Sequence, residues 1–196
     1  MLETIIIALI ICKIKGYKIK GLFNTWEIYT VILIESIYIF LQVNIYFNNY
    51  FFIEYVGVLK SLYLCSYLPI IFKYKRYVQA LIGSVFVFTG GILNDIAIKA
   101  NSGYMPAFPT LSYLTGYVSK ETFNEIDNLH RLGNSETNLK ILTDIFDTGY
   151  SILSLGDIFI RVYVFIIIYS VIKEINVGNK ETNVNDKEIN KSVQEV

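Results

Sequence analysis

Three aspartates surround the start of the last apolar segment of the chain: Asp144, Asp147 and Asp157. A carboxylate at the edge of a membrane-spanning helix is costly to bury, so it needs a stabilising partner or a function. Two carboxylates that share one proton in a partly dry site can act as base and acid toward water. Asp144 and Asp157, with the turn-forming Gly149 between them, are the candidate catalytic pair of an aspartyl-type hydrolase. Asp147 can replace Asp144 in that pair.

The residues around Asp157 allow two other interpretations. Arg161 follows it by four positions, so the two side chains share a helix face and can pair. Ser154 precedes it by three positions, the spacing of a capping box in which Asp157 accepts a hydrogen bond from the backbone of Ser154 or Leu155. The first interpretation keeps Asp157 ionised, and the second makes it a structural residue.

Other polar residues fall at two levels of the apolar segments. Asn94 and Asp95 lie in the last turn of one segment, level with Asp157, which predicts a cavity that opens beneath the loop that follows. Glu35, Lys60 and Arg161 lie deeper. Charges at that depth are costly unless they are paired or face water, so we expect a neutralised network or a solute path.

The loop over residues 99–151 is longer than a simple connection requires, and long loops are often functional. Asn101 and Gly103 indicate a turn at its start, and Ser119 indicates a helix over 119–126. His130 is the only histidine. Without a second ligand nearby in the pattern, neither a metal nor a cofactor is predicted. The candidate binding residues are thus Asn94, Asp95, Asn101, Gly103, His130, Arg161, Glu35 and Lys60.

The elements that must position these residues are apolar helices. The chain of 196 residues is 54% hydrophobic and only 17% charged, below the charge content of an average soluble domain. Its net charge of zero gives no attraction to nucleic acid. A helix needs about 20 apolar residues to cross a bilayer. The predicted spans are 2–14, which is short, and 28–47, 51–72, 78–98 and 152–172.

The basic residues orient these spans. They follow the first, third and fifth spans and are absent between the second and third, so the positive-inside rule puts the N-terminus outside and the C-terminus in the cytoplasm. The loop 99–151 is then external. Residues 1–175 form the bundle, and the polar tail 176–196 has no apolar face and is predicted to be disordered. The fold class is an all-α membrane protein of about five transmembrane helices with a structured external loop.

Several motifs together resemble a known family. Asn101-x-Gly103-x-Met105-Pro106, the single His130, Leu142-Thr143-Asp144-Ile145 and Ser154-Leu155-Gly156-Asp157 are similar in order to an uncharacterised membrane family of Gram-positive bacteria, the domain of unknown function 5317. The resemblance covers nearly all of the chain except the tail. It implies about five spans in a bacterial cell membrane and no particular activity.

A fainter similarity is to the lipoprotein signal peptidases, which are membrane aspartic proteases. Asn101-x-Gly103, Asp144-Ile145-Phe146 and Ser154-Leu155-Gly156-Asp157 resemble their motifs, although Ser154 replaces an Asn and the family has four spans. This similarity implies catalytic roles for Asp144 and Asp157.

Three functions follow from the sequence. The first is a non-catalytic binder, carrier or partner subunit, with an unknown protein partner and with the lipid bilayer around it. The second is an aspartyl-type hydrolase that acts on a membrane-embedded peptide or a lipid-linked substrate. The third is a purely structural bundle in which the motif residues cap helices.

Overall fold

The computed structural model describes the backbone of residues 1–47, 49, 51–52, 56–118 and 129–194, and the side chains of these residues up to 178 except residue 56. The helix predicted over 119–126 lies outside the described residues. The chain is mostly helical. Its helices are α1 (Leu2–Ile14), α2 (Lys20–Phe23), α3 (Ile28–Tyr46), α4 (Val56–Cys65), α5 (Leu68–Lys73), α6 (Tyr77–Ala100), α7 (Leu111–Leu114), α9 (Leu155–Gln194) and the short 3₁₀ turn η2 (Lys140–Leu142).

Three of these helices are long and apolar enough to cross a membrane: α3, α6 and the first part of α9, Leu155–Gly178. They coincide with three of the predicted spans, because an apolar run of that length is a strong sequence signal. The prediction of five spans is not confirmed, because only three helices of the described residues meet this length and composition. The helix in the first predicted span, α1, has 13 residues.

The third predicted span, 51–72, is not one helix. The chain forms α4 and then α5, with an interruption at Ser66 and Tyr67. Pro69 lies in the first turn of α5, where its missing N–H is tolerated, whereas inside a continuous helix it would remove a backbone hydrogen bond. The carbonyl of Ser66 instead accepts a hydrogen bond from Thr30 Oγ1 at 2.7 Å.

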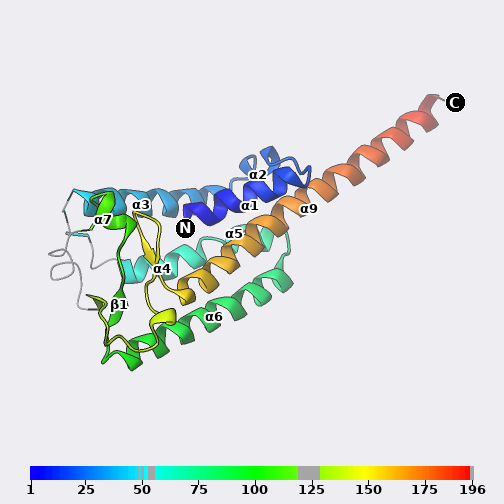
Figure 1. The fold of residues 1–196 in the computed structure, drawn as a ribbon. Coiled ribbons are helices and arrows are strands. Elements are labelled where there is room, and N and C mark those ends of the chain that lie inside the picture. The colour runs from blue at the N-terminus through cyan, green and yellow to red at the C-terminus, as the bar shows by residue number, and fades with distance from the viewer. Residues whose placement is uncertain (48, 50, 53–55, 119–128, 195–196) are drawn as a thin grey trace.

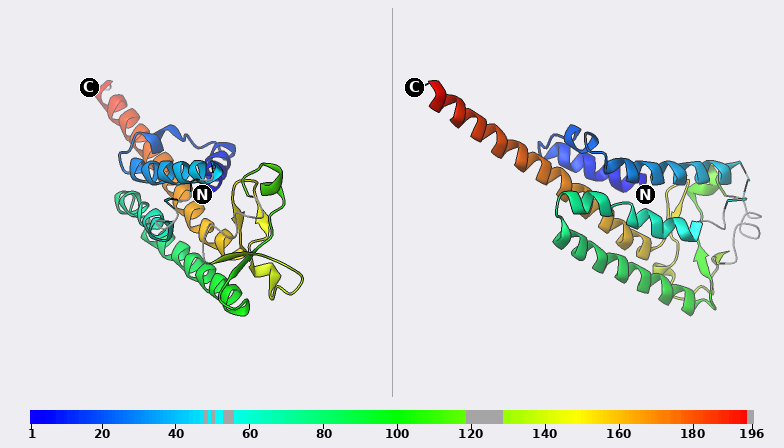
Figure 2. Two further views of the ribbon diagram at one scale, coloured as in Figure 1. Left: turned by 90° about the vertical axis from the view of Figure 1, so that its left-hand side faces the viewer. Right: turned by 180° about the vertical axis from the view of Figure 1, so that it is seen from behind.

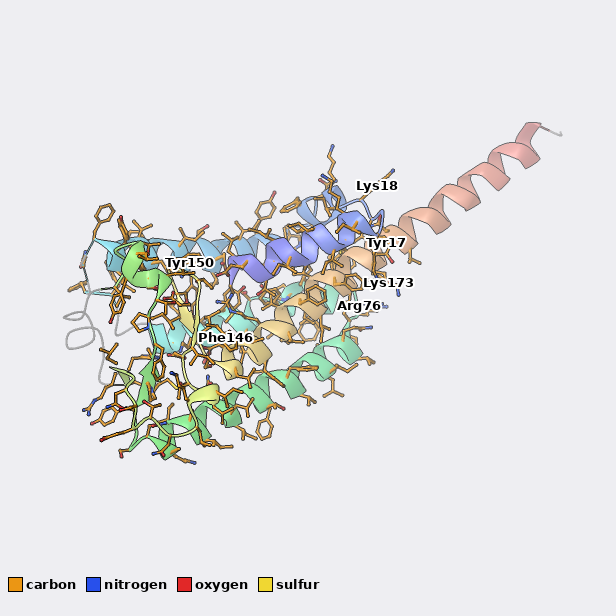
Figure 3. The ribbon with its side chains drawn as sticks, viewed as in Figure 1. Tyr17, Lys18, Arg76, Phe146, Tyr150 and Lys173 are labelled. Atoms are coloured by element: carbon orange, nitrogen blue, oxygen red, sulfur yellow. The ribbon has the colours of Figure 1, made fainter. Side chains whose placement is uncertain are left out.

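The long segments alternate in direction (Figure 1). From one end of the bundle, α1, α4–α5 and α9 run one way, and α3 and α6 run the other way. Residues 99–118 and 129–151 lie at one end, called here the loop end. Lys18, Arg76 and Lys173 lie at the opposite end, called the basic end, while Phe146 and Tyr150 lie toward the loop end (Figure 3).

The central helix is α9. It runs between α1 and α6 (Figure 2) and packs against both. The core gathers around it toward the basic end, where one face of α9 contributes five fully buried residues, three to four positions apart in pairs. These core residues are Ala8, Cys12, Tyr63, Tyr67, Ile70, Val164, Ile167, Ile168, Val171 and Ile172.

Glycines let α6 and α9 approach closely. A Cβ atom on Gly90 would collide with the carbonyl oxygen of Gly156, and one on Gly156 would collide with Asn94. Gly83, seven residues before Gly90, faces Tyr163 at similarly short range. Small residues at such positions allow dispersion contacts and polar contacts between helices where no hydrophobic driving force exists, as in a bilayer.

The loop is structured, and it contains strands that an all-α prediction does not include. The described strands are β1 (Met105–Ala107), β2 (His130–Leu132), β3 (Phe146–Asp147) and β4 (Ile152–Leu153). β1 pairs with β2 in parallel, Met105 opposite His130, and β3 pairs with β4 in antiparallel orientation. Ala107 also forms a parallel bridge with Asp144. Residues 130 and 144 therefore flank the same short strand.

Beyond Gly178, α9 leaves the bundle (Figure 1). Its backbone is helical to Gln194, across most of the segment 176–196 that the sequence predicts to be a disordered tail. The domain boundary at 175/176 and the disorder of the tail stay predictions, since a helix gains most of its stability from packing an apolar face and this segment offers none.

Candidate functional site: a cavity at the loop end

A cavity of about 500 Å³ lies between the helices at the loop end. Its wall combines side chains of α3, α4, α6 and α9 with residues of the loop. Four of the eight predicted binding residues line it, together with both predicted catalytic residues, Asp144 and Asp157.

 The candidate binding residues on the wall are Lys60, Asn94, His130 and Arg161. The other lining residues are Met1, Tyr38, Gln42, Ile45, Ser61, Leu64, Ala107, Tyr117, Val118, Ser151, Ile152, Leu153 and Ile160.

Asp157 is held at the start of α9 by a capping box. The backbone N–H of Ser154 donates to Asp157 Oδ2 at 3.2 Å, and the N–H of Asp157 donates to Ser154 Oγ at 2.9 Å. This is the structural arrangement that the Ser-x-x-Asp spacing predicts. Asn94 Nδ2 also donates to Asp157 Oδ1 at 3.2 Å, and Ser154 Oγ donates to Asn94 Oδ1 at 2.7 Å. The carboxylate is therefore fixed by neutral donors and by the N-terminal end of the helix.

Asp144 is buried, with only 3% of its surface exposed. Its backbone is fixed beside β1, since its N–H donates to the carbonyl of Pro106 at 3.0 Å and its carbonyl accepts from the N–H of Phe108 at 2.8 Å. Its Oδ2 lies 3.4 Å from His130 Nε2. A carboxylate in this position orients the imidazole. His130, predicted only as a single polar residue, therefore belongs to a pair that lines the cavity.

Arg161 forms its ion pair with Glu3. Arg161 Nη1 donates to Glu3 Oε2 at 2.8 Å, and no ion pair joins Arg161 to Asp157 in the part of the chain that the structure describes. The predicted pairing with Asp157 is therefore wrong: same-face spacing brings two side chains within reach, but α1 packs against α9 and supplies a carboxylate in a better position. Glu3 also accepts a hydrogen bond from Tyr150. Burial, followed by this hydrogen bond, raises the pKa of Tyr150 to about 12.

The predicted charged network is present only in part. Glu35 connects to Arg161 through the Met1 ammonium and Glu3. Among the described residues, Lys60 and Asp157 form no ion pair with this network. Glu35 on α3 is 6% exposed and does not line the cavity; its carboxylate lies 3.6 Å from the Met1 ammonium. Lys60 on α4 lines the cavity. Within the described residues, no ion pair to Lys60 is found.

Besides Glu35, three candidate binding residues lie outside the cavity wall. Asp95 is exposed on α6. Asn101 caps the end of α6, because its Nδ2 donates to the carbonyl of Ala97 at 2.8 Å and its Oδ1 accepts from the N–H of Asn138 at 2.9 Å. Gly103 has a φ of +89°, which glycine adopts without strain, and its N–H closes the helix end on the carbonyl of Ile98. The last two residues form the turn that the sequence indicates.

Asp147 orders the loop and does not line the cavity. Its carboxylate accepts hydrogen bonds from the N–H of Thr110 at 2.6 Å, from the N–H and Oγ of Ser112 at 2.8 and 2.6 Å, and from the N–H of Gly149 at 2.8 Å. Burial by itself raises the pKa of Asp147, but these hydrogen bonds outweigh it and lower the pKa below its usual value. Asp147 is therefore not the partner of Asp157.

Sequence reasoning did not single out several residues of the wall. Tyr38, Gln42, Ser61 and Ser151 line the cavity. Tyr38 and Gln42 are four positions apart on α3, so a polar pair on one face of an otherwise apolar helix is the signal that would have found them. Among the described residues, no group of three or more His, Cys, Asp or Glu side chains is arranged to hold a metal ion.

Comparison with known proteins gives one match. A family described as a family of unknown function (DUF5317) matches residues 19–169, which include every cavity-lining residue except Met1. No curated protein and no solved structure matches, so the similarity to lipoprotein signal peptidases gains no support. Because the match covers well over half of the chain, the chain belongs to the family of unknown function DUF5317.

Proposed function

We propose that this protein is a multi-pass membrane protein that binds a small solute or a lipid headgroup in the cavity at the loop end, as a carrier, a binder or a subunit of a larger assembly. The observation that carries the proposal is the composition of one wall. Charged residues from three places, Lys60 on α4, Asp144 in the loop and Asp157 on α9, face the same space of about 500 Å³. Ligand sites are concave, partly apolar and supplied with a few polar groups.

The proposed topology has five passes, with the N-terminus and the loop outside and the C-terminus in the cytoplasm of a bacterium. Its support is the gathering of Lys18, Arg76 and Lys173 at the basic end (Figure 3) and the alternating direction of the helices. In this topology α1 and α4–α5 are the two short passes, and the cavity opens beneath the external loop.

The binding proposal is tested by blocking the cavity. Ser61 lines it, whereas Ser84 is exposed on α6 away from it. We expect native mass spectrometry of the purified wild-type protein to detect a retained small molecule or lipid that the Ser61→Trp variant has lost. Ser84→Trp introduces the same side chain elsewhere and should retain the ligand. Equal retention by both variants would contradict binding in the cavity.

Orientation is tested by cysteine labelling in cells. Cys65, which is exposed, is first replaced by Ser. A membrane-impermeant maleimide should label Glu136→Cys in intact cells and Lys18→Cys only after permeabilisation. The reverse pattern would put the loop in the cytosol and remove the proposed external site.

A second candidate function is the hydrolase, and one observation favours it: both predicted catalytic residues, Asp144 and Asp157, line the same cavity. The hydrogen bonds from Asn94 and Ser154 engage Asp157 as a carboxylate, and His130 lies beside Asp144. In this function the His130–Asp144 pair is the better placed to take a proton from water. Lipid and lipoprotein profiling of a deletion strain tests it: a precursor that accumulates, and that Asp144→Asn fails to clear, would establish hydrolysis.

A further inference from the structure

The charged side chains on the cavity wall do not all have a side-chain partner within ion-pair distance. Arg161 has Glu3, and Asp144 has His130. Lys60 and Asp157 differ from these, because no ion pair joins either of them to another side chain in the described part of the chain. Asp157 is stabilised by neutral hydrogen-bond donors and by the N-terminal end of α9. The wall therefore presents one cationic and one anionic side chain that have no side-chain partner of opposite charge among the described residues.

These two groups come from different helices of the same cavity. Lys60 lies on α4 and Asp157 in the first turn of α9, and the two form no ion pair with each other. Uncompensated charges in a bundle of apolar helices are costly, unless water or a ligand supplies the opposite charge. A ligand that carries both signs would compensate both residues at once.

Most of the remaining wall is apolar or aromatic, beside the neutral polar residues Gln42, Ser61 and Ser151. Ile45, Leu64, Leu153 and Ile160 line the cavity, and Tyr38 lies on the same wall. An ammonium group is also attracted to aromatic rings. The volume, about 500 Å³, lies in the range of small-molecule sites.

We propose that the cavity binds a zwitterion, with the ligand's ammonium group toward Asp157 and its carboxylate or phosphate toward Lys60. This inference rests on the proposed binding function and names the chemistry of the ligand. A free amino acid or betaine and the headgroup of phosphatidylethanolamine share this chemistry.

The experiment measures binding to the full-length protein purified in a non-ionic detergent, which introduces no zwitterion. Thermal-shift and calorimetric titrations use four probes: glycine betaine, alanine, short-chain phosphatidylethanolamine and, as a ligand with only a negative charge, short-chain phosphatidylglycerol. A bound ligand raises the unfolding temperature in proportion to its occupancy. We expect at least one zwitterionic probe to bind about tenfold or more tightly than phosphatidylglycerol. Preference for betaine or alanine identifies a solute, and preference for phosphatidylethanolamine identifies a lipid.

Charge variants identify the contacts. Lys60→Gln and Asp157→Asn should each weaken binding of that probe by about tenfold or more, because each leaves one ligand charge without a partner. Asp157→Glu and Lys60→Arg keep the charge and should retain most of the affinity, which separates charge from folding. Lys99→Gln and Glu136→Gln change exposed residues outside the cavity and should bind as the wild type does.

Two results would overturn the inference. One is equal or tighter binding of phosphatidylglycerol, and the other is zwitterion binding that survives both Lys60→Gln and Asp157→Asn. In either case the binding function itself stands if Ser61→Trp still removes the ligand that the wild type retains. If Ser61→Trp removes nothing, the binding function fails as well.

Discussion

The two ends of the bundle differ in what their interior contains. Toward the basic end, α9 contributes the fully buried Val164, Ile167, Ile168, Val171 and Ile172. At the loop end, the same helix contributes Asp157 and Arg161 to the wall of a cavity. One helix therefore belongs to a close-packed core over some of its turns and places two charged residues on the wall of a mostly apolar cavity over others. Stability and the proposed ligand binding depend on different turns of one element.

The largest expected effect lies in the core. Ile168 is fully buried, so Ile168→Ala should lower the free energy of unfolding in detergent by about 2 kcal/mol. This is the low end for such substitutions. The unfolded helices stay in an apolar medium, so most of the loss comes from the cavity that the smaller side chain leaves behind. Leu64→Ala removes a side chain that already borders open space, and should cost clearly less. Equal losses would erase the contrast between the two ends. Thermal and denaturant unfolding of both variants give the comparison.

A medium effect is expected in the loop. Asp147→Asn leaves the donors of Thr110 and Ser112 with a neutral acceptor, so the loop should lose about 1 kcal/mol of local stability. Hydrogen exchange of the peptide 105–116 near neutral pH measures it, with Glu136→Gln as the control. Asp147→Asn leaves the charges of Lys60 and Asp157 unchanged. A change in its ligand affinity would therefore show that the order of the loop also determines the shape of the cavity.

The same carboxylate gives the loop a pH dependence whose sign can be stated. Hydrogen bonds lower the pKa of Asp147 in the folded state. Its contribution to stability is therefore present above the pKa of an unfolded Asp, about 3.9, and is lost as the pH falls through the lower folded value. Asp147→Asn should remove this acid-dependent loss. If wild type and variant lose loop protection in parallel on acidification, Asp147 is not its cause.

The contrast between the ends also explains what the sequence predicts well. A membrane-spanning helix can be predicted from the length of its apolar run, and α3, α6 and the start of α9 coincide with predicted spans. The capping box of Ser154 and Asp157 is local, so its spacing predicts it. The partner of Arg161 is Glu3, 158 positions away. Helical spacing predicts only pairs three or four positions apart, so it cannot identify this partner. The strands of the loop have two or three residues, too few to show an alternating pattern.

The break between α4 and α5 has a signal in the sequence. Pro69 lies inside the apolar run 51–72, and proline inside a helix removes a backbone hydrogen bond. The length of the run, which matches a bilayer, favours one continuous span and hides this signal. Asn94 and Asp95 share one level of the bundle, but only Asn94 lines the cavity, because a helix turns neighbouring side chains toward different faces.

The smallest effect is expected at the basic end, where the ion pair of Arg76 and Glu174 joins the loop after α5 to α9 at 3.0 Å. The Glu174 side chain is 40% exposed, so water and salt screen the pair and Glu174→Gln should change the free energy of unfolding by about 1 kcal/mol or less. Raising the salt concentration should reduce even this difference, which unfolding in low and high salt measures. A loss as large as that of Ile168→Ala would mean that charge, and not the apolar packing of α9, holds this end together.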